Sequence, residues 1–367
     1  MSFDKRKAEL KKPKLLVAIS GGVDSSVAGV LLKEREYNIT GAYIRTWMNE
    51  YSISANCPWQ EELDLARRIT QIIGIPFHLV NLIGDYREKV VQYLLDGYSR
   101  GFTPNPDVIC NREIKFGCFL DYALQNGYNG VATGHYCRKT ENDDGTFSLF
   151  EGKDKNKDQS YFLALISQYQ LSHSVFPLGD LDKKKVRQLA RNNMLPNAER
   201  KDSQGICFLG KVKINEFLES YIPDNPGEII NISGQKIGTH KGLHRYTLGQ
   251  RKGIGIPSNT YNESYVVISK NHTQNQLVIG FDRSSSDGLY GRRFRINNLN
   301  FLNQPLDNND KLLSKPRYRD PSTPILFRQT GTAEAEIEFK LPQRALAPGQ
   351  ICALYDGERL VGGGTYY

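Results

Sequence analysis

The chain has 367 residues, of which 39% are hydrophobic and 24% are charged, which predicts two or three globular domains and excludes a wholly disordered protein. Its longest clean apolar run near the start spans only residues 15–19, and residues 1–14 contain no apolar run, so we expect neither a membrane protein nor a secretory signal. Lys and Arg outnumber Asp and Glu by 48 to 40, a net charge of +8 that permits a polyanionic partner. The expected compartment is the cytoplasm, where the six cysteines are reduced thiols.

The first two hundred residues alternate between strand-like and helix-like segments. Short apolar runs that end in turns indicate buried strands, and apolar residues at helical spacing indicate amphipathic helices. This alternation is typical of an α/β domain with a doubly wound parallel sheet, in which ligands bind outside the carboxyl ends of the strands. Strands are predicted at residues 15–19, 40–47, 76–82 and 130–133, and helices at 25–36, 61–73, 86–98 and 112–124.

After about residue 210 the pattern changes to one helix, at 214–221, followed by short strands from about residue 264. Residues 333–339 alternate apolar side chains with glutamates, which predicts a strand with one buried face. Asp356-Gly357 between two apolar runs predicts a hairpin. We therefore expect a catalytic α/β domain at residues 1–210, a small mixed central domain at 211–285 and a C-terminal β-barrel-like domain at 286–367.

The most specific motif is SGGVDSS, residues 20–26, which lies between the first predicted strand and the first predicted helix. Gly21 and Gly22 allow a tight turn whose backbone N–H groups face an anion, and Ser25 lies where the helix dipole favours phosphate. The chain has no GxxxxGK[ST] motif, so this is not the loop of enzymes that cleave the γ-phosphate. The motif resembles the SGGxDS pyrophosphate loop of the ATP pyrophosphatase (PP-loop) superfamily. The plain alternative is a Gly-Ser turn with a helix cap.

Two cysteines lie in motifs with charged or rigid surroundings. TPNPDVICN, residues 103–111, places Asp107 and Cys110 just before a predicted helix, and KDSQGICFLG, residues 201–210, places Cys207 near basic residues. Both settings favour the thiolate. Taken singly, each cysteine is more commonly a buried inert thiol. That structural interpretation is kept for Cys57, Cys118, Cys137 and Cys352, of which Cys118 and Cys352 are expected in the core.

These motifs occur in the order found in tRNA-specific 2-thiouridylases, together with TGHY (133–136), KDQSYFL (157–163), RYTLGQRKGIG (245–255), RYRDP (317–321) and APGQ (347–350). The resemblance covers nearly the whole chain. It implies that ATP contacts Ala18, Ile19, Ser20, Gly21, Gly22, Val23, Asp24, Ser25, Ile44 and Gly134. It implies that the target base meets Asn105, Pro106 and Asp107, and that other tRNA contacts are His135, Lys157, Asp158, Gln159, Arg317, Tyr318 and Gln350.

The resemblance also implies the reaction. The enzyme adenylates the C2 oxygen of the wobble uridine, releases pyrophosphate, and replaces this oxygen with sulfur to give 2-thiouridine and AMP. Cys207 carries a persulfide received from a sulfur-donor protein, and Cys110 is the second reactive thiol. Cys110 either releases sulfide by attacking Cys207 or accepts a disulfide after direct attack by the persulfide, and both routes stay open. Asp107 is placed to act as acid or base. Mg²⁺ is expected with ATP, on ligands that the sequence does not identify.

Several of these residues have plainer alternatives. His135 can be a structural histidine, Lys157-Asp158 a solvated charge pair, and Arg317 part of an exposed strand edge. No acidic residue lies between Glu228 and Glu263, where five cations favour contact with RNA phosphates over a merely solvated loop: Lys236, Lys241, Arg245, Arg251 and Lys252.

Three rival functions fit parts of this sequence. Another adenylating synthetase has no need of two reactive cysteines, and an iron–sulfur thiolase favours a CxxC pair that this chain lacks. A non-catalytic RNA-binding protein does not require Asp24, Ser25 and both cysteines. ATP–pyrophosphate exchange and mass analysis of thiolated tRNA separate these functions.

Overall fold

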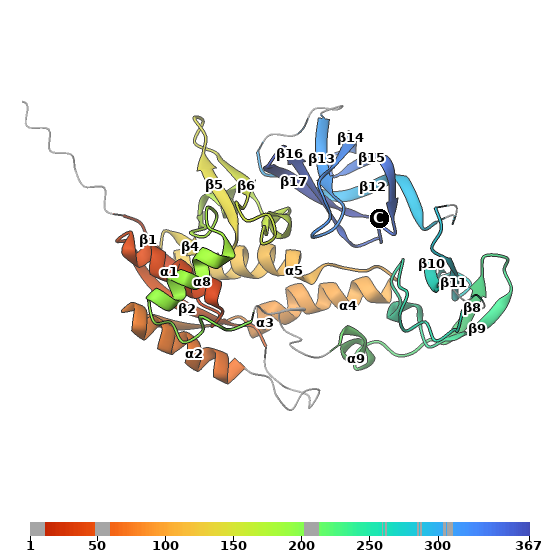
Figure 1. The fold of residues 1–367 in the computed structure, drawn as a ribbon, viewed down its shortest axis with the longest axis horizontal. Coiled ribbons are helices and arrows are strands. Elements are labelled where there is room, and N and C mark those ends of the chain that lie inside the picture. The colour runs from red at the N-terminus through yellow and green to blue at the C-terminus, as the bar shows by residue number, and fades with distance from the viewer. Residues whose placement is uncertain are drawn as a thin grey trace, which may run out of the picture.

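The computed structural model describes residues 12–47, 59–201, 213–258, 260, 263–284, 286, 288–303, 306 and 311–367. Figure 1 shows an α/β body formed by the first half of the chain, a small central β domain, and a C-terminal barrel. No helix in these described ranges is long and apolar enough to cross a membrane.

The α/β body is built on a five-stranded parallel sheet in the order β3-β2-β1-β4-β7. The prediction of a parallel sheet is confirmed, and β1 to β4 lie within a few residues of the predicted strands. The strands are β1 (Lys14–Ala18), β2 (Asn38–Arg45), β3 (Phe77–Asn81), β4 (Gly130–Ala132) and β7 (Ser174–Val175).

Helices cover both faces of this sheet, as expected for a doubly wound fold. Along β1, Leu15 and Val17 belong to the core that contains residues of α1, α2 and α8, whereas Leu16 belongs to the core that contains residues of α4, α5 and α6. The helices are α1 (Val23–Glu34), α2 (Trp59–Ile73), α3 (Ile83–Tyr86), η1 (Arg87–Val91), α4 (Gln92–Ser99), α5 (Pro106–Ile109), η2 (Cys110–Cys118), α6 (Phe119–Gln125), η3 (Ser160–Leu163), α7 (Gln168–Ser172) and α8 (Lys183–Asn192).

The helix predicted at residues 112–124 begins earlier than expected. It starts at Pro106 and runs through α5, η2 and α6, with a kink at Gly117, where φ is −103° and ψ is −105°. The prediction that Cys110 precedes this helix is therefore wrong. Since the helix dipole acts mainly on the first turn, it does not account for a thiolate at Cys110.

The C-terminal domain is a closed barrel. Its strands follow the order β12-β15-β14-β13-β16-β17, and β12 also pairs with β17, which closes the ring. Ala335, Ile337 and Phe339 are buried, as their alternation predicts, and Gly357 turns the expected hairpin with φ of 58°. The strands are β12 (Tyr290–Phe301), β13 (Lys311–Lys315), β14 (Thr323–Gly331), β15 (Glu334–Arg344), β16 (Ile351–Asp356) and β17 (Arg359–Tyr366).

A hairpin from the α/β body extends the barrel sheet. Strands β5 (Cys137–Glu141) and β6 (Phe147–Glu151) pair with each other, and β6 pairs with β17 through Leu149 and Leu360. The sequence did not predict this hairpin, which joins the first domain to the last (Figure 1).

The central domain combines one short helix with a four-stranded sheet in the order β10-β11-β8-β9. Its small core includes Ile229, Val267, Leu277 and Ile279. The elements are α9 (Ile214–Glu219), β8 (Gly227–Asn231), β9 (Lys236–His240), η4 (Leu243–Arg245), β10 (Tyr265–Asn271) and β11 (Gln276–Phe281).

Candidate active site

The SGGVDSS loop leaves the carboxyl end of β1 and closes on itself at the start of α1. Gly21 has φ of +77°, a conformation that glycine adopts without strain. The Ser25 hydroxyl donates to the Gly22 carbonyl at 2.9 Å and accepts from the Ser20 N–H at 3.2 Å. Ser26 donates to the same carbonyl at 2.9 Å. These bonds fix the loop beside the start of α1, where an anion is favoured.

Two residues far along the chain, Asn197 and Arg200, donate hydrogen bonds to the SGGVDSS loop. Asn197 donates to the Gly21 carbonyl and to the Ser26 hydroxyl, both at 2.9 Å. Arg200 also reaches the Gly21 carbonyl, at 3.4 Å, and pairs with Glu62 at 2.9 Å. The sequence motifs did not single out Asn197 or Arg200 as supports of the loop.

Asp24, in the first turn of α1, is held by two side chains from other elements. The Lys183 ammonium lies 2.7 and 2.8 Å from its two carboxylate oxygens, and the Tyr136 hydroxyl donates to one of them at 2.6 Å. Lys183 is the first residue of α8, in a Lys-Lys-Lys run that reads as the start of a surface helix. Sequence reasoning therefore missed the cation nearest to Asp24.

Gly134 and His135 connect this loop to the helix of Cys110. A Cβ atom at Gly134 would lie 2.7 Å from the Ser25 backbone nitrogen, so the chain passes against the SGGVDSS loop, residues 20–26, at this point. This loop is called the phosphate loop below, after the role that the sequence predicts for it. His135 is buried between Phe116 and Phe176, and its Nδ1 lies 2.7 Å from the Thr133 hydroxyl. Burial, with a smaller contribution from Lys115, lowers the pKa of His135 well below its usual range. His135 is therefore a neutral side chain at physiological pH.

The TPNPD segment is organised as a helix start. Asn105 caps α5 by accepting from the Val108 N–H at 3.2 Å, and Pro106 occupies the first turn. Asp107 follows, half-buried, and burial raises its pKa while the positive charge of Lys115 opposes the shift. Lys115 therefore acts on both Asp107 and His135. Cys110 is only 5% exposed, one turn further along the helix.

Asn111, beside Cys110, carries a buried acceptor. Its amide nitrogen donates to the Asp107 carbonyl at 3.0 Å. This bond identifies the other amide atom as the oxygen. That oxygen, Oδ1, is buried and has no hydrogen-bond partner among the described residues. A buried acceptor of this kind is satisfied by a ligand N–H or by water.

The remaining cysteines have structural or undescribed positions. Cys118 is not in the core as predicted. It is partly buried and packs against the core, and its thiol donates to an Asp85 carboxylate oxygen at 3.6 Å. Burial and the Asp85 charge raise the pKa of Cys118 to about 11, and burial raises the pKa of Cys352 to about 11. Cys57 and Cys207 lie outside the described residues.

Two of the residues predicted to contact tRNA, Asp158 and Gln159, make hydrogen bonds within the fold. Asp158 is 4% exposed, accepts from the Gly152 and Ser160 N–H groups, and pairs with Lys315 at 2.7 Å. The alternative of a solvated Lys157-Asp158 pair is thus wrong for Asp158. Gln159 accepts from the Tyr136 N–H at 3.1 Å.

The C-terminal candidates also make contacts within the chain. Arg317 donates to the Ala345 carbonyl at 2.6 Å and to the Arg344 carbonyl. Tyr318 packs on Phe162 with ring centroids 4.3 Å apart. Gln350 donates to the Thr103 carbonyl at 2.7 Å. The structure does not bring these three residues into direct contact with the phosphate loop.

Three of the five cations of the acid-free basic stretch pair with acidic residues. Arg245 pairs with Glu219 and Asp224, Arg251 pairs with Asp282, and Lys236 lies 3.1 Å from Glu228. Lys241 is exposed. The stretch is therefore less positive in space than along the chain.

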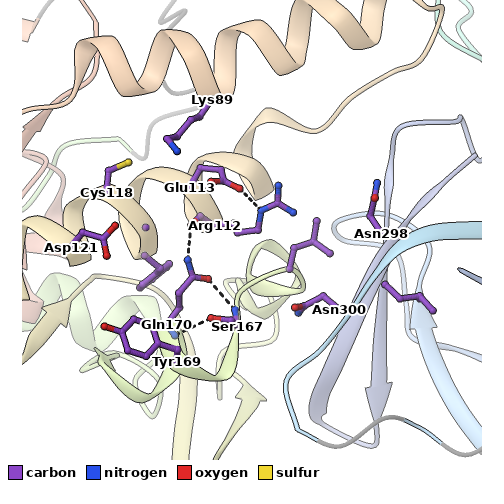
Figure 2. A pocket seen from close by; sticks show the side chains of 14 residues that line it. Lys89, Arg112, Glu113, Cys118, Asp121, Ser167, Tyr169, Gln170, Asn298 and Asn300 are labelled. Atoms are coloured by element: carbon purple, nitrogen blue, oxygen red, sulfur yellow. Dashed lines mark hydrogen bonds and ion pairs between the residues drawn. The ribbon is translucent and has the colours of Figure 1, made fainter. Parts of the chain in front are cut away.

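A cavity of about 590 Å³ lies beside the site and is shown in Figure 2. It opens between η2, α7 and the barrel, and its walls include Arg112, Glu113 and Phe116 of the helix that carries Cys110. Gln170 donates to the Arg112 carbonyl at 2.8 Å, at the place where the kink would otherwise leave this group unpaired. Neither the phosphate loop nor Cys110 lines this cavity, so it is distinct from the candidate site.

Comparison with known proteins gives matches along nearly the whole chain. Family models match as a tRNA methyl transferase HUP domain at residues 13–211, a tRNA methyl transferase PRC-barrel domain at 215–281 and an aminomethyltransferase beta-barrel domain at 291–366. The tRNA-specific 2-thiouridylase MnmA of Akkermansia muciniphila is 46% identical over 96% of this chain and 98% of its own length. The protein of the same name from Halalkalibacterium halodurans is 43% identical over 97% of this chain and 96% of its own length.

Proposed function

The chain belongs to the tRNA-specific 2-thiouridylase family, and we propose that it adenylates the wobble uridine of tRNA and replaces its C2 oxygen with sulfur. The observation that supports this reaction most directly is the link formed by Gly134 and His135. Gly134 packs on the phosphate loop, and His135 packs on Phe116 of the helix that carries Cys110. An enzyme that joins ATP to a nucleobase requires a nucleotide site and a base site held in fixed register.

ATP lies on the loop from Ala18 to Ser25, with Ile44 and Gly134 at its sides. The loop N–H groups and the Lys183 ammonium contact the phosphate oxygens. The N–H groups lie at the start of α1, where the helix dipole favours an anion, and the ammonium carries a positive charge. The uridine O2 attacks the α-phosphorus, and pyrophosphate leaves. Mg²⁺ would neutralise phosphate charge in such a site, and it is usually held by one or two carboxylates and phosphate oxygens. Asp24 is the carboxylate of the loop, but Lys183 and Tyr136 hold its oxygens in this structure.

The uridine lies against Asn105, Pro106 and Asp107. Burial raises the pKa of Asp107, which brings its carboxyl closer to the pH at which it can exchange a proton with the base. His135 is neutral and positions the wall of this site through Phe116. Further tRNA contacts are assigned to Lys157, Arg317, Tyr318 and Gln350, and Asp158 and Gln159 support the segment that carries Lys157.

Sulfur arrives as a persulfide on Cys207, which a donor protein loads in the cytoplasm. In one route the terminal sulfur attacks C2 and expels AMP, and Cys110 then attacks the Cys207 sulfur, which frees the 2-thiouridine. In the other route Cys110 attacks first and releases hydrosulfide, which then attacks C2. Both routes end with a Cys110–Cys207 disulfide that an external thiol must reduce.

The domain boundaries predicted above, at residues 210 and 285, form part of this proposal.

The test is an assay with unmodified tRNA, ATP, Mg²⁺ and a persulfide donor. We expect 2-thiouridine, AMP and pyrophosphate in equal amounts, and no turnover by the Ser25→Ala variant, which loses the bonds that close the loop. ADP and phosphate as tRNA-dependent products would contradict the assignment of the loop. AMP without a thiolated nucleoside would indicate a different adenylating enzyme, and tRNA binding without either product a non-catalytic protein.

A further inference from the structure

Thr103, two residues before Asn105, is the point at which the three domains meet. Its N–H donates to the Pro348 carbonyl at 2.8 Å, and its carbonyl accepts from the Gln350 side chain at 2.7 Å. Its hydroxyl lies 3.4 Å from the hydroxyl of Thr247 in the central domain. The backbone of the segment that leads to the base-binding residues is thus held by the barrel, and its side chain contacts the central domain.

The segment enters this junction along a defined path. At the end of α4 the Phe102 N–H bonds the Gly97 carbonyl at 2.9 Å and the Gly101 N–H bonds the Tyr98 carbonyl at 3.0 Å, which is a Schellman motif. Gly101 has φ of +79°, and a Cβ atom there would overlap the His272 ring of the central domain. Figure 1 shows α4 running from the α/β body to this domain. The chain therefore has little freedom before Thr103.

The barrel side of the junction is equally constrained. The Gly349 N–H donates to the Tyr366 carbonyl at 2.8 Å, and the Tyr366 N–H donates to the Gln350 carbonyl at 2.9 Å, so strand β17 holds the turn. Gly349 has φ of +92°, and a Cβ atom there would lie 3.0 Å from the backbone N and C of Thr103. Thr103 and the turn at 348–350 are packed backbone against backbone, which leaves no space for adjustment.

We propose that Gly349 and Gln350 are positioning residues for the uridine, acting through Thr103 on the segment Asn105–Asp107. This inference rests on the proposed function. Pro104 and Pro106 stiffen the short connection, so a displacement of Thr103 is passed on to Asp107. Gln350, expected from the sequence as a tRNA contact, thereby orients the base-binding segment in the free protein. An RNA that binds the barrel and the central domain therefore binds the two domains whose residues Gln350 and Thr247 contact Thr103.

The first test compares two alanine substitutions at positive φ. Gly349→Ala presses on Thr103, whereas Gly145→Ala, at φ of +79° in the β5–β6 turn, meets nothing within 4 Å. Because small displacements of reacting groups slow chemistry strongly, we expect Gly349→Ala to lower the single-turnover rate of tRNA adenylation by about tenfold or more. The KM for ATP stays at the wild-type value in both variants, since the phosphate loop does not contact Gly349. Equal rates for the two variants at saturating tRNA would overturn the proposal.

The second test uses the free protein and does not depend on the activity. Gln350→Met keeps the size of the side chain and removes the donor to the Thr103 carbonyl. We expect amide hydrogen exchange at Thr103 to speed up by about tenfold in Gln350→Met and Gly349→Ala, and to be unchanged in Gly145→Ala. Unchanged exchange in all three would overturn the positioning role even if the enzyme thiolates tRNA. Faster exchange in these variants of a protein that never adenylates tRNA would contradict the proposed function. It would still support the role of Gly349 and Gln350 in holding Thr103.

Discussion

Lys183 and Asp24 form a two-pronged ion pair, with distances of 2.7 and 2.8 Å, although 159 residues separate them in the chain. The pair joins the first turn of α8 to the first turn of α1. It therefore places a lysine ammonium beside the loop on which the triphosphate of ATP is bound in our account.

Lys183→Ala is expected to weaken ATP binding. A cation that contacts phosphate oxygens makes charge-assisted hydrogen bonds, and its loss should raise the KM for ATP by about 10- to 100-fold. Lys184→Ala, which removes an exposed neighbour on the same helix, is the matched control and should leave the KM unchanged. Steady-state kinetics of pyrophosphate release measure both. A normal KM in Lys183→Ala would show that this lysine only holds Asp24.

Gly134→Ala is expected to deform the phosphate loop. The added Cβ would lie 2.7 Å from the Ser25 nitrogen and 2.8 Å from the Asp24 carbonyl carbon, and these backbone atoms cannot move independently of α1. ATP affinity, measured by calorimetry, should fall by about tenfold or more, since steric overlap with the backbone costs more than about 1 kcal/mol. Gly84→Ala, with nothing within 4 Å, is the control. Equal affinity in the two variants would place ATP elsewhere.

Asp107→Asn should separate stability from activity. Burial raises the pKa of Asp107, so the folded state disfavours its charge and loses stability as the pH rises through that raised pKa. The asparagine variant does not carry this penalty. Its melting temperature should exceed that of the wild type increasingly as the pH rises from about 4, the pKa of an unfolded Asp, to the raised pKa of the folded state, and by a constant amount above it, because the carboxyl is protonated in both states at lower pH. Adenylation should be lost throughout. A difference in melting temperature that does not change with pH would contradict the buried-carboxyl assignment.

The basic stretch of the central domain should contribute unevenly to RNA binding. Lys241 is exposed, so Lys241→Ala should reduce the slope of log affinity against log salt by about one unit. Arg245 is paired with Glu219 and Asp224, so Arg245→Ala should lower the melting temperature and change the slope little. Filter binding of tRNA at several salt concentrations tests this. Equal slopes for wild type and Lys241→Ala would assign the stretch to a solvated loop.

Sequence patterns were sufficient to predict the strands, turns and helices whose formation depends on residues close to one another in the chain. The apolar run and the glycines around residues 15–22 were enough to place a strand, a phosphate loop and a helix in order, because each depends on neighbours in sequence. The alternation at Ala335, Ile337 and Phe339 likewise identified a barrel strand and its buried face. The charge stretch failed as a local pattern, since Glu219, Asp224 and Asp282 lie outside it in sequence and against it in space.

Long-range partners were beyond the reach of such patterns. Lys183 sits in a lysine run typical of a solvated helix, and only the packing of α8 against α1 brings it to Asp24. Gln350 and Thr103 are 247 residues apart, and neither has a distinctive local environment. The β5–β6 hairpin was missed for a related reason, because its pairing partner, β17, is at the other end of the chain. The contacts that hold the candidate site could not be predicted from such motifs, because they join segments far apart in the sequence.

Cys110 and Cys207, which we propose to be the reactive cysteines, carry the central claim, and single substitutions separate their proposed roles. Cys207→Ala should still adenylate tRNA and should not accept a persulfide. Cys110→Ser should accept a persulfide on Cys207 and should not form 2-thiouridine. Cys118→Ser is the matched control, because burial and Asp85 raise the pKa of Cys118 to about 11 and make it a poor nucleophile at neutral pH.

The most direct measurement is a single turnover of persulfide-loaded wild-type enzyme with ATP and tRNA in the absence of reductant. Nucleoside analysis and peptide mapping are made on the same sample. The account predicts one Cys110–Cys207 disulfide for each 2-thiouridine formed, which requires the two Cα atoms to approach within about 7 Å. Formation of 2-thiouridine with Cys207 paired to Cys118, or with Cys110 and Cys207 both left as thiols, would contradict it.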